Sequence, residues 1–272
     1  MRPHPEIRLR TTVTLTIVII KNGFCLKLIT FDIFKPFNKL FHVFSTRIGG
    51  ISVAPFDGLN LGLHTADNPQ DVKKNRRLFF EKLSISRDRV VFPEQVHSSK
   101  VQIVSKPGIV EKCDGLITSQ KNLFLSVQTA DCFPVFLYDP NKEVIALIHS
   151  GWRGTASNIC GETILMMKDR LGCNPHDILA AVGPGVQQNC YQVDEKTAAH
   201  FASAFLLPDG EKHYKLNVQE AIVAQLMEKG VPAAQIEIDS TCTHCAVQLY
   251  YSYRRDGAKS GRMMGIIGIR EI

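Results

Sequence analysis

Three apolar runs follow one another in the middle of the chain: LFLSVQ (residues 123–128), PVFLYD (134–139) and VIALIHS (144–150). Each is short and rich in β-branched or aromatic residues, and the turn sequence Asp139-Pro140-Asn141 separates the second run from the third. This pattern is typical of buried strands joined by turns. The centre of the chain is therefore predicted to be a sheet.

The segments on either side alternate only partly between helix and strand. Asn68-Pro69 resembles a helix start, with a capping residue followed by proline at the first helical position, and the helix should run to about Leu83. Partial alternation favours a mixed sheet over a doubly wound parallel one, so we predict a single mixed α/β domain. The other predicted elements are helices over 155–171, 194–205 and 217–229, and strands over 41–46, 90–92, 101–104, 177–182, 235–240, 250–255 and 262–269.

Composition excludes several classes of protein. The chain has 272 residues, of which 44% are hydrophobic and 21% charged, and its net charge is only +6. Its densest basic group, Lys73, Lys74, Arg76 and Arg77, fits a solvated helix face better than a nucleic-acid footprint. We expect no nucleic-acid partner, although a basic pocket for an anion such as phosphate stays open.

Residues 1–27 form a separate N-terminal extension ahead of a predicted catalytic domain over 28–272. Arginines precede the run VTLTIVII (13–20), which superficially resembles a signal peptide. The run is too short to span a bilayer, and no small-residue cleavage site follows it. We interpret the extension as either an extra strand or a disordered segment, and we expect a cytoplasmic protein without a membrane partner.

Eight cysteines in a chain of this size do not indicate a disulfide scaffold, and buried reduced thiols are the simpler interpretation. The closest pair is Cys242-Thr243-His244-Cys245. A single C-x-x-C motif can be a redox pair, half of a zinc site or two structural thiols, and the sequence leaves these alternatives open.

Three other residues point to a metal centre. His97 lies in the turn-like segment FPEQVHSS, Cys132 precedes Phe-Pro, and His149 ends an apolar strand. Two imidazoles and one thiolate suit zinc with a fourth position open. The spacing is not a compact zinc signature, and each residue alone also fits a structural role.

Polar residues near these positions are candidates for binding substrate. Asp131 could accept a hydrogen bond from a ligand imidazole and so orient it. Trp152 could stack on a base and Arg153 could hold an anion, because they follow His149 where a helix begins. Arg47 follows another strand and could bind phosphate. Arg254 and Arg255 lie beside tyrosines, although arginines on an exposed edge strand would look the same in sequence.

Taken together, these segments resemble the YfiH or laccase-domain family. The resemblance covers about residues 30–270, in order, and rests on FSTRIGG (44–50), FPEQVHS (92–98), CDGLIT (113–118), TADCFPV (129–135), IHSGWRG (148–154), AVGPGV (181–186) with Cys190-Tyr191, and YSYRRDG (251–257). Members are bacterial and animal proteins once called polyphenol oxidases and now described as zinc-dependent purine nucleoside phosphorylases.

The resemblance implies both a site and an activity. His97, Cys132 and His149 match the family's zinc ligands, and Arg47 would lie near the pocket. The implied reactions are phosphorolysis of adenosine, inosine, guanosine and methylthioadenosine, with orthophosphate as co-substrate, and deamination of adenosine. The implied fold is a four-layer α/β/β/α arrangement with mixed sheets. We expect a monomer or a weak homodimer.

Three other functions remain as alternatives. A cysteine hydrolase would use Cys132 as nucleophile and His149 as base, without a metal. A copper-dependent phenol oxidase would explain the older family name, but the nine histidines include no H-x-H pair of the kind that multicopper sites use. A nucleoside sensor would bind purines without turning them over. The zinc enzyme is the preferred prediction.

Overall fold

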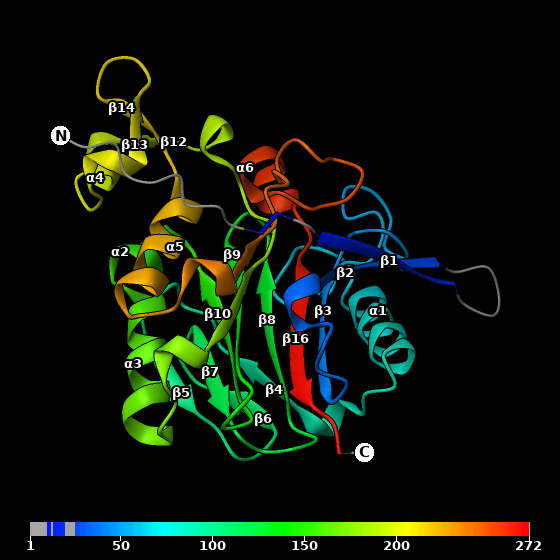
Figure 1. Cartoon of the computed structure of the whole chain (residues 1–272). Coiled ribbons are helices and arrows are strands. Elements are labelled where there is room, and N and C mark those ends of the chain that lie inside the picture. The colour runs from blue at the N-terminus through cyan, green and yellow to red at the C-terminus, as the bar shows by residue number, and fades with distance from the viewer. Residues whose placement is uncertain (1–9, 12, 20–24, 272) are drawn as a thin grey trace.

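The computed structural model describes residues 10–11, 13–19 and 25–271, which form two large sheets and one small one (Figure 1). The seven-stranded sheet has the order β1 (Val13–Ile19), β2 (Cys25–Phe31), β3 (Leu40–Ser45), β16 (Met263–Ile269), β8 (Phe124–Thr129), β4 (Val90–Pro93) and β6 (Gly108–Val110). The six-stranded sheet has the order β15 (Ile236–Ile238), β11 (Leu179–Val182), β9 (Phe133–Asp139), β10 (Val144–Ser150), β7 (Gly115–Thr118) and β5 (Val101–Ile103). The small sheet contains β12 (Gln192–Asp194), β14 (His213–Leu216) and β13 (Leu206–Pro208).

Both large sheets are mixed, which confirms the predicted class. β4 runs parallel to β8 and β6 in the first sheet. β5 runs parallel to β7, and β11 to β15, in the second. The other pairs in these sheets are antiparallel, including β9 with β10 and β8 with β16, so the three central apolar runs are divided between the two sheets.

Alternating side chains on the central strands build separate cores on the two faces of each sheet. On β10, Val144, Ala146 and Ile148 pack with α3 (Ile159–Leu171) and α5 (Val218–Glu228). The intervening Ile145 and Leu147 join the core between the two large sheets. A strand whose residues are apolar at every position therefore serves two layers at once.

The other large sheet repeats this arrangement with α1 (Pro69–Lys82). Leu125 and Val127 of β8 face the core between the sheets, whereas Phe124 packs with Phe79 and Phe80 of α1. Figure 1 shows α1 on one side of the two sheets and α3 and α5 on the other. The order is α/β/β/α, so the four-layer prediction is confirmed.

Two predicted helices have the expected boundaries, and two do not. α1 begins at Pro69 with Asn68 as its cap, and α5 covers most of the predicted 217–229 helix. The predicted 155–171 helix is divided into α2 (Trp152–Ala156) and α3, because Asn158 adopts a left-handed conformation with φ of 59°. The predicted 194–205 helix is only α4 (Glu195–Ala198), since Ala202 is extended.

The predicted strand over 250–255 is wrong. Tyr250 and Tyr251 are buried, but the chain then enters the short helix α6 (Tyr253–Asp256). The side chain of Ser252 caps this helix by accepting a hydrogen bond from the Arg255 amide. A capping serine therefore outweighs the strand propensity of the aromatic residues.

The apolar run of the N-terminal extension contributes β1, which pairs with β2 in antiparallel register from Val13–Phe31 to Ile19–Cys25. β2 begins at Cys25, inside the predicted extension. Residues 1–9, 12 and 20–24 of the extension lie outside the part of the chain that the structure describes. Among the residues described, no helix has the length and apolar character needed to cross a membrane.

Candidate functional site

The structure brings His97, Cys132 and His149 together, although they come from three different segments. His97 lies between β4 and β5, Cys132 between β8 and β9, and His149 in β10 near its end. One ligand atom from each lies within 4.8 Å of the others. The two imidazole rings are 4.7 Å apart and nearly perpendicular. We call these three residues the His₂Cys cluster.

Asp114 positions His149. Its Oδ1 lies 2.8 Å from His149 Nδ1, and both side chains are buried. The antiparallel register of β7 and β10 pairs Gly115 with Ile148, which brings Asp114 opposite His149. A carboxylate that binds Nδ1 leaves Nε2 free to bind a ligand, as in many metal sites.

The sequence analysis predicted that Asp131 would orient a ligand imidazole, but in the structure Asp114 does so. The carboxylate of Asp131 accepts hydrogen bonds from Thr243 Oγ1 (2.6 Å) and the Arg254 amide (2.5 Å). Asp131 therefore fixes the turn that carries Cys132. Asp114 is in the segment CDGLIT, but only the pairing of β7 with β10 reveals its contact with His149.

The carboxylate of Asp114 also positions the segment that carries His97. Asp114 accepts hydrogen bonds from the backbone amides of His97 (3.0 Å) and Ser98 (2.6 Å). His97 has φ of 58°, a conformation that is uncommon outside glycine and here is held by these contacts. One buried aspartate thus orients the imidazole of His149 and fixes the backbone that carries His97.

Gly151 allows the three ligands to converge. A Cβ atom at this position would lie 2.8 Å from Cys132 Sγ and 3.2 Å from His97 Nδ1. Any larger residue would enter the space between the ligands. The glycine that follows β10 is therefore needed for close approach rather than for turn formation alone.

Charge within the cluster favours a thiolate. Burial raises the pKa of the Cys132 thiol, but the charge of His149 and hydrogen bonds from both imidazoles outweigh it, so the pKa falls to about 6. Burial lowers the pKa of His149, whereas Cys132 and Asp114 raise it, and the net result is about 9. Both shifts favour an ionised Cys132 sulfur, the form that binds a metal.

The cluster opens into a cavity of about 1020 Å³, which is large enough for a nucleoside and an anion. Four of the predicted binding residues line it: Asp131, Trp152, Arg153 and Arg254. The sequence analysis did not select several others: Arg76, Arg87, Tyr191, Tyr253 and Arg262. Their only signal was the recurrence of aromatic and arginine residues in segments that are far apart.

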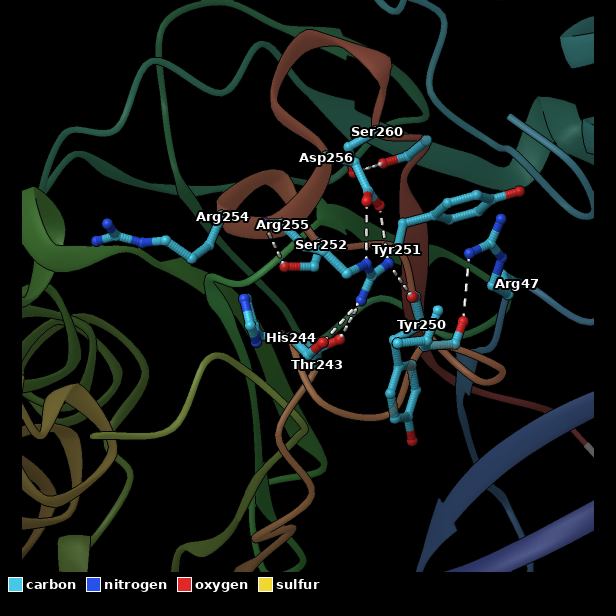
Figure 2. A network of polar contacts seen from close by, with 12 residues as sticks. Arg47, Thr243, His244, Tyr250, Tyr251, Ser252, Arg254, Arg255, Asp256 and Ser260 are labelled. Carbon is cyan, nitrogen blue, oxygen red and sulfur yellow. Dashed lines mark hydrogen bonds and ion pairs between the residues drawn. The ribbon is translucent and has the colours of Figure 1, made fainter. Parts of the chain in front are cut away.

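Arg47 and Arg255 do not line this cavity. Arg47 forms an ion pair with Asp57 (2.8 Å) and stacks over Tyr251. Arg255 donates hydrogen bonds to the backbone carbonyls of Thr243, His244 and Tyr250, as Figure 2 shows. In the same view Arg254 extends away from that network. These contacts give Arg47 and Arg255 a structural role, which departs from the expectation that they bind substrate.

The His₂Cys cluster fits a zinc ion. It offers two imidazoles and a readily ionised thiol, and Asp114 holds one ring in the orientation that ligation requires. The cavity side of the cluster leaves room for a further ligand. The three residues can therefore hold a metal with an open coordination position.

Comparison with known proteins identifies the family. The model of the family described as "Multi-copper polyphenol oxidoreductase laccase" matches residues 41–270. The chain belongs to this family. The matched range includes all three residues of the His₂Cys cluster and Asp114.

Several relatives in this laccase family are named for a different activity. The purine nucleoside phosphorylase YlmD of Bacillus subtilis is 36% identical over 244 residues, covering 84% of this chain and 88% of the relative. The purine nucleoside phosphorylase YfiH of Escherichia coli is 33% identical, covering 82% and 91%. The crystal structure of YlmD from Geobacillus stearothermophilus has a TM-score of 0.83 at 33% identity, covering 93% of this chain and 98% of that one.

Proposed function

We propose that this protein is a zinc-dependent purine nucleoside phosphorylase that acts on adenosine, inosine, guanosine and methylthioadenosine and also deaminates adenosine. The main observation in support is that two imidazoles and a thiol converge in a cavity lined by arginines and aromatic rings. The names of the relatives support the phosphorylase part of this proposal. We further propose a cytoplasmic location, because all eight cysteines lie within the described residues and none forms a disulfide.

The residues of the cavity can be assigned to the two substrates by their chemistry. A purine ring would stack on the aromatic side chains, of which Trp152 and Tyr191 lie beside cationic residues. When bound, zinc would act as a Lewis acid towards a substrate oxygen. His97, Cys132 and His149 would hold it, while Asp114 keeps His149 correctly oriented.

Arg262 is our candidate for binding orthophosphate. Its Nη1 donates to the carbonyls of Ser260 and Gly261, and within the described residues its Nη2 and Nε form no hydrogen bond. Burial lowers the pKa of Arg262, but the charges of Cys132 and Asp131 oppose this effect, which places the guanidinium near the cluster. Arg153 and Arg254 line the same cavity and add positive charge.

In phosphorolysis, a phosphate oxygen forms a bond to C1′ while the bond from C1′ to the purine nitrogen breaks. The departing purine takes up the proton that hydrogen phosphate gives up, and the sugar carries positive charge in the transition state. The arginines hold the phosphate dianion on the reacting face, which reduces the entropic cost of bringing the two substrates together. Arg262 is half-buried in the cavity wall, and this partial shielding from water strengthens its hold on the phosphate.

The experiment is to measure phosphate-dependent release of free base from inosine and adenosine, with the bound metal quantified. We expect a chelator to abolish release and zinc to restore it. Arg262→Gln should raise the KM for phosphate roughly 10- to 100-fold, the equivalent of one charge-assisted hydrogen bond. Arg262→Lys should recover part of the loss, and Arg47→Gln should leave this KM unchanged. No base release at full zinc occupancy would contradict the proposal.

A thiol hydrolase is the second candidate, because Cys132, His149 and Asp114 also form a nucleophile–base–acid series. Such an enzyme needs one imidazole, however, and His97 supplies a second at the same point. The two functions differ in their response to His97→Ala and to chelation. A hydrolase would keep its activity in both cases and lose it on alkylation of Cys132.

The copper-dependent phenol oxidase remains a third possibility because of the family's description. The residues of the His₂Cys cluster would also bind copper. Phenol oxidation by the copper-loaded protein, with no base release by the zinc-loaded protein, would favour this function.

A further inference from the structure

A second group of sulfur and nitrogen ligands lies outside the His₂Cys cluster. Cys190 Sγ is 3.2 Å from Cys245 Sγ, and Cys245 Sγ is 4.0 Å from His244 Nδ1. One ligand atom from each of these three residues lies within 4.8 Å of the others. Cys242, the other cysteine of the C-x-x-C motif, interacts with the thiols of Cys190 and Cys245 but lies outside this group of three. We call Cys190, Cys242, His244 and Cys245 the thiol cluster.

The sulfur of Cys242 faces a backbone donor. The Gln187 amide lies 3.4 Å from the sulfur. Backbone amides directed at a cysteine sulfur stabilise the ionised form that metals bind.

The turn between the two cysteines of the motif is held in place by a neighbouring cation. Arg255 donates hydrogen bonds from Nη1 to the carbonyls of Thr243 and His244, at 3.1 and 2.9 Å (Figure 2). The amide of Ala246 donates to the carbonyl of Cys242. The C-x-x-C turn is therefore preorganised by contacts that do not involve the sulfurs, as a ligand loop requires.

We propose that the thiol cluster is a second metal site, which binds a thiophilic cation such as Zn²⁺ through three thiolates and one imidazole. A tetrahedral zinc ion with bonds to sulfur of about 2.3 Å separates its thiolates by about 3.8 Å. Cys190 and Cys245 need to move apart by only about half an ångström from their 3.2 Å separation to reach that geometry. Cys₃His is a common ligand set of closed structural zinc sites.

The position of the thiol cluster would let a bound metal support the wall of the cavity. Tyr191, which follows Cys190, lines the cavity, and Thr243, between the cysteines, donates a hydrogen bond to Asp131 beside Cys132. A metal at the thiol cluster would join the 187–191 and 242–245 segments directly behind the cavity wall. It would thus support the residues that hold the substrate without touching it.

The test is to count zinc in protein purified with reductant and reloaded with zinc. The wild type should bind about two ions per chain, and the variant His244→Ala/Cys245→Ser about one. Cys132→Ser should also bind about one. Cys25→Ser is the matched control, because Cys25 is half-buried and lies outside both clusters, and it should bind as many ions as the wild type.

Cobalt loading provides a spectroscopic measurement of the same site. Three of the four thiolates in the two sites belong to the thiol cluster, so it should supply most of the thiolate-to-cobalt absorption of the wild type. His244→Ala/Cys245→Ser should lose most of that absorption. A double variant that binds as many zinc ions as the wild type, or a Cys132→Ser variant that binds none, would overturn the proposal. A reductant-sensitive disulfide between Cys190 and Cys245 in zinc-loaded protein would also overturn it.

Discussion

At the scale of single residues, Asp114 has the largest number of roles in the site. It is fully buried, it binds the ring of His149, and it accepts amide hydrogen bonds from the segment that carries His97. The three ligands themselves provide the donor atoms. Their convergence depends on this carboxylate and on the missing side chain at Gly151.

The variant Asp114→Asn tests this dependence. Asparagine has nearly the same shape but cannot supply two anionic acceptors, so His149 and the His97 loop should lose their alignment. We expect zinc to bind at the His₂Cys cluster 10- to 100-fold more weakly, as is usual when a group that orients a ligand is removed. Competition against a chelator of known affinity measures the change.

The control for this variant is Asp57→Asn, whose side chain is 63% exposed and pairs with Arg47 outside the cavity. It should bind zinc as tightly as the wild type. An Asp114→Asn protein that is folded and binds zinc with unchanged affinity would show that the carboxylate does not orient the cluster.

At the scale of elements, His42 joins two neighbouring strands. It lies on β3, it is buried, and its Nε2 accepts a hydrogen bond from the Phe31 amide at the end of β2 (2.9 Å). Burial lowers the pKa of His42 to about 4. The ring is therefore neutral in the folded protein near neutral pH.

This burial predicts a pH dependence of stability. The unfolded chain takes up a proton on His42 near its ordinary pKa of about 6.5, whereas the folded chain does so only near 4. The free energy of unfolding should therefore be highest above pH 6.5 and should fall as the pH drops from 6.5 to 4, by up to about 3 kcal/mol from this group.

Urea unfolding at several pH values measures the effect, with His42→Gln as the comparison, because its amide oxygen can still accept from Phe31. As the pH drops from 6.5 to 4, the free energy of unfolding of the wild type should fall relative to that of His42→Gln by up to about 3 kcal/mol. Parallel curves for the two proteins would mean that His42 is protonated without unfolding.

At the scale of the whole molecule, the two large sheets are joined by the core between them. Phe136 of β9 lies in this core with its ring centre 5.2 Å from that of Phe31 of β2. The His₂Cys cluster lies at strand ends and loops, outside the middle of this core. Stability and metal binding should therefore be separable.

Phe136→Ala should lower the free energy of unfolding by about 3–5 kcal/mol, because it leaves a cavity between two sheets that cannot readily collapse. Urea denaturation measures the loss, and Leu207→Ala, at a side chain that is 52% exposed, should change stability little. Zinc binding by the folded Phe136→Ala protein should match that of the wild type. A loss below about 1 kcal/mol would show that the sheets repack around the gap.

The sequence by itself determined the local features of this protein. The apolar runs predicted β8, β9 and β10, Asn68-Pro69 predicted the start of α1, and the turns beside His97, Cys132 and His149 marked these residues as candidate ligands. Each of these depends on side-chain periodicity or on a few neighbouring residues, which a sequence displays directly. The mistaken strand at 250–255 and the shortened helix at 194–205 mark where local propensity gave way to capping and packing.

Only the tertiary structure decided which polar groups meet. Asp114 reaches His149 because of the register of β7 and β10, and Arg262 enters the cavity while Arg47 turns towards Asp57. The thiol cluster brings Cys190 next to Cys245, which lies 55 residues further along the chain. Such contacts depend on how distant strands align, and the spacing of residues along a chain carries no record of that alignment.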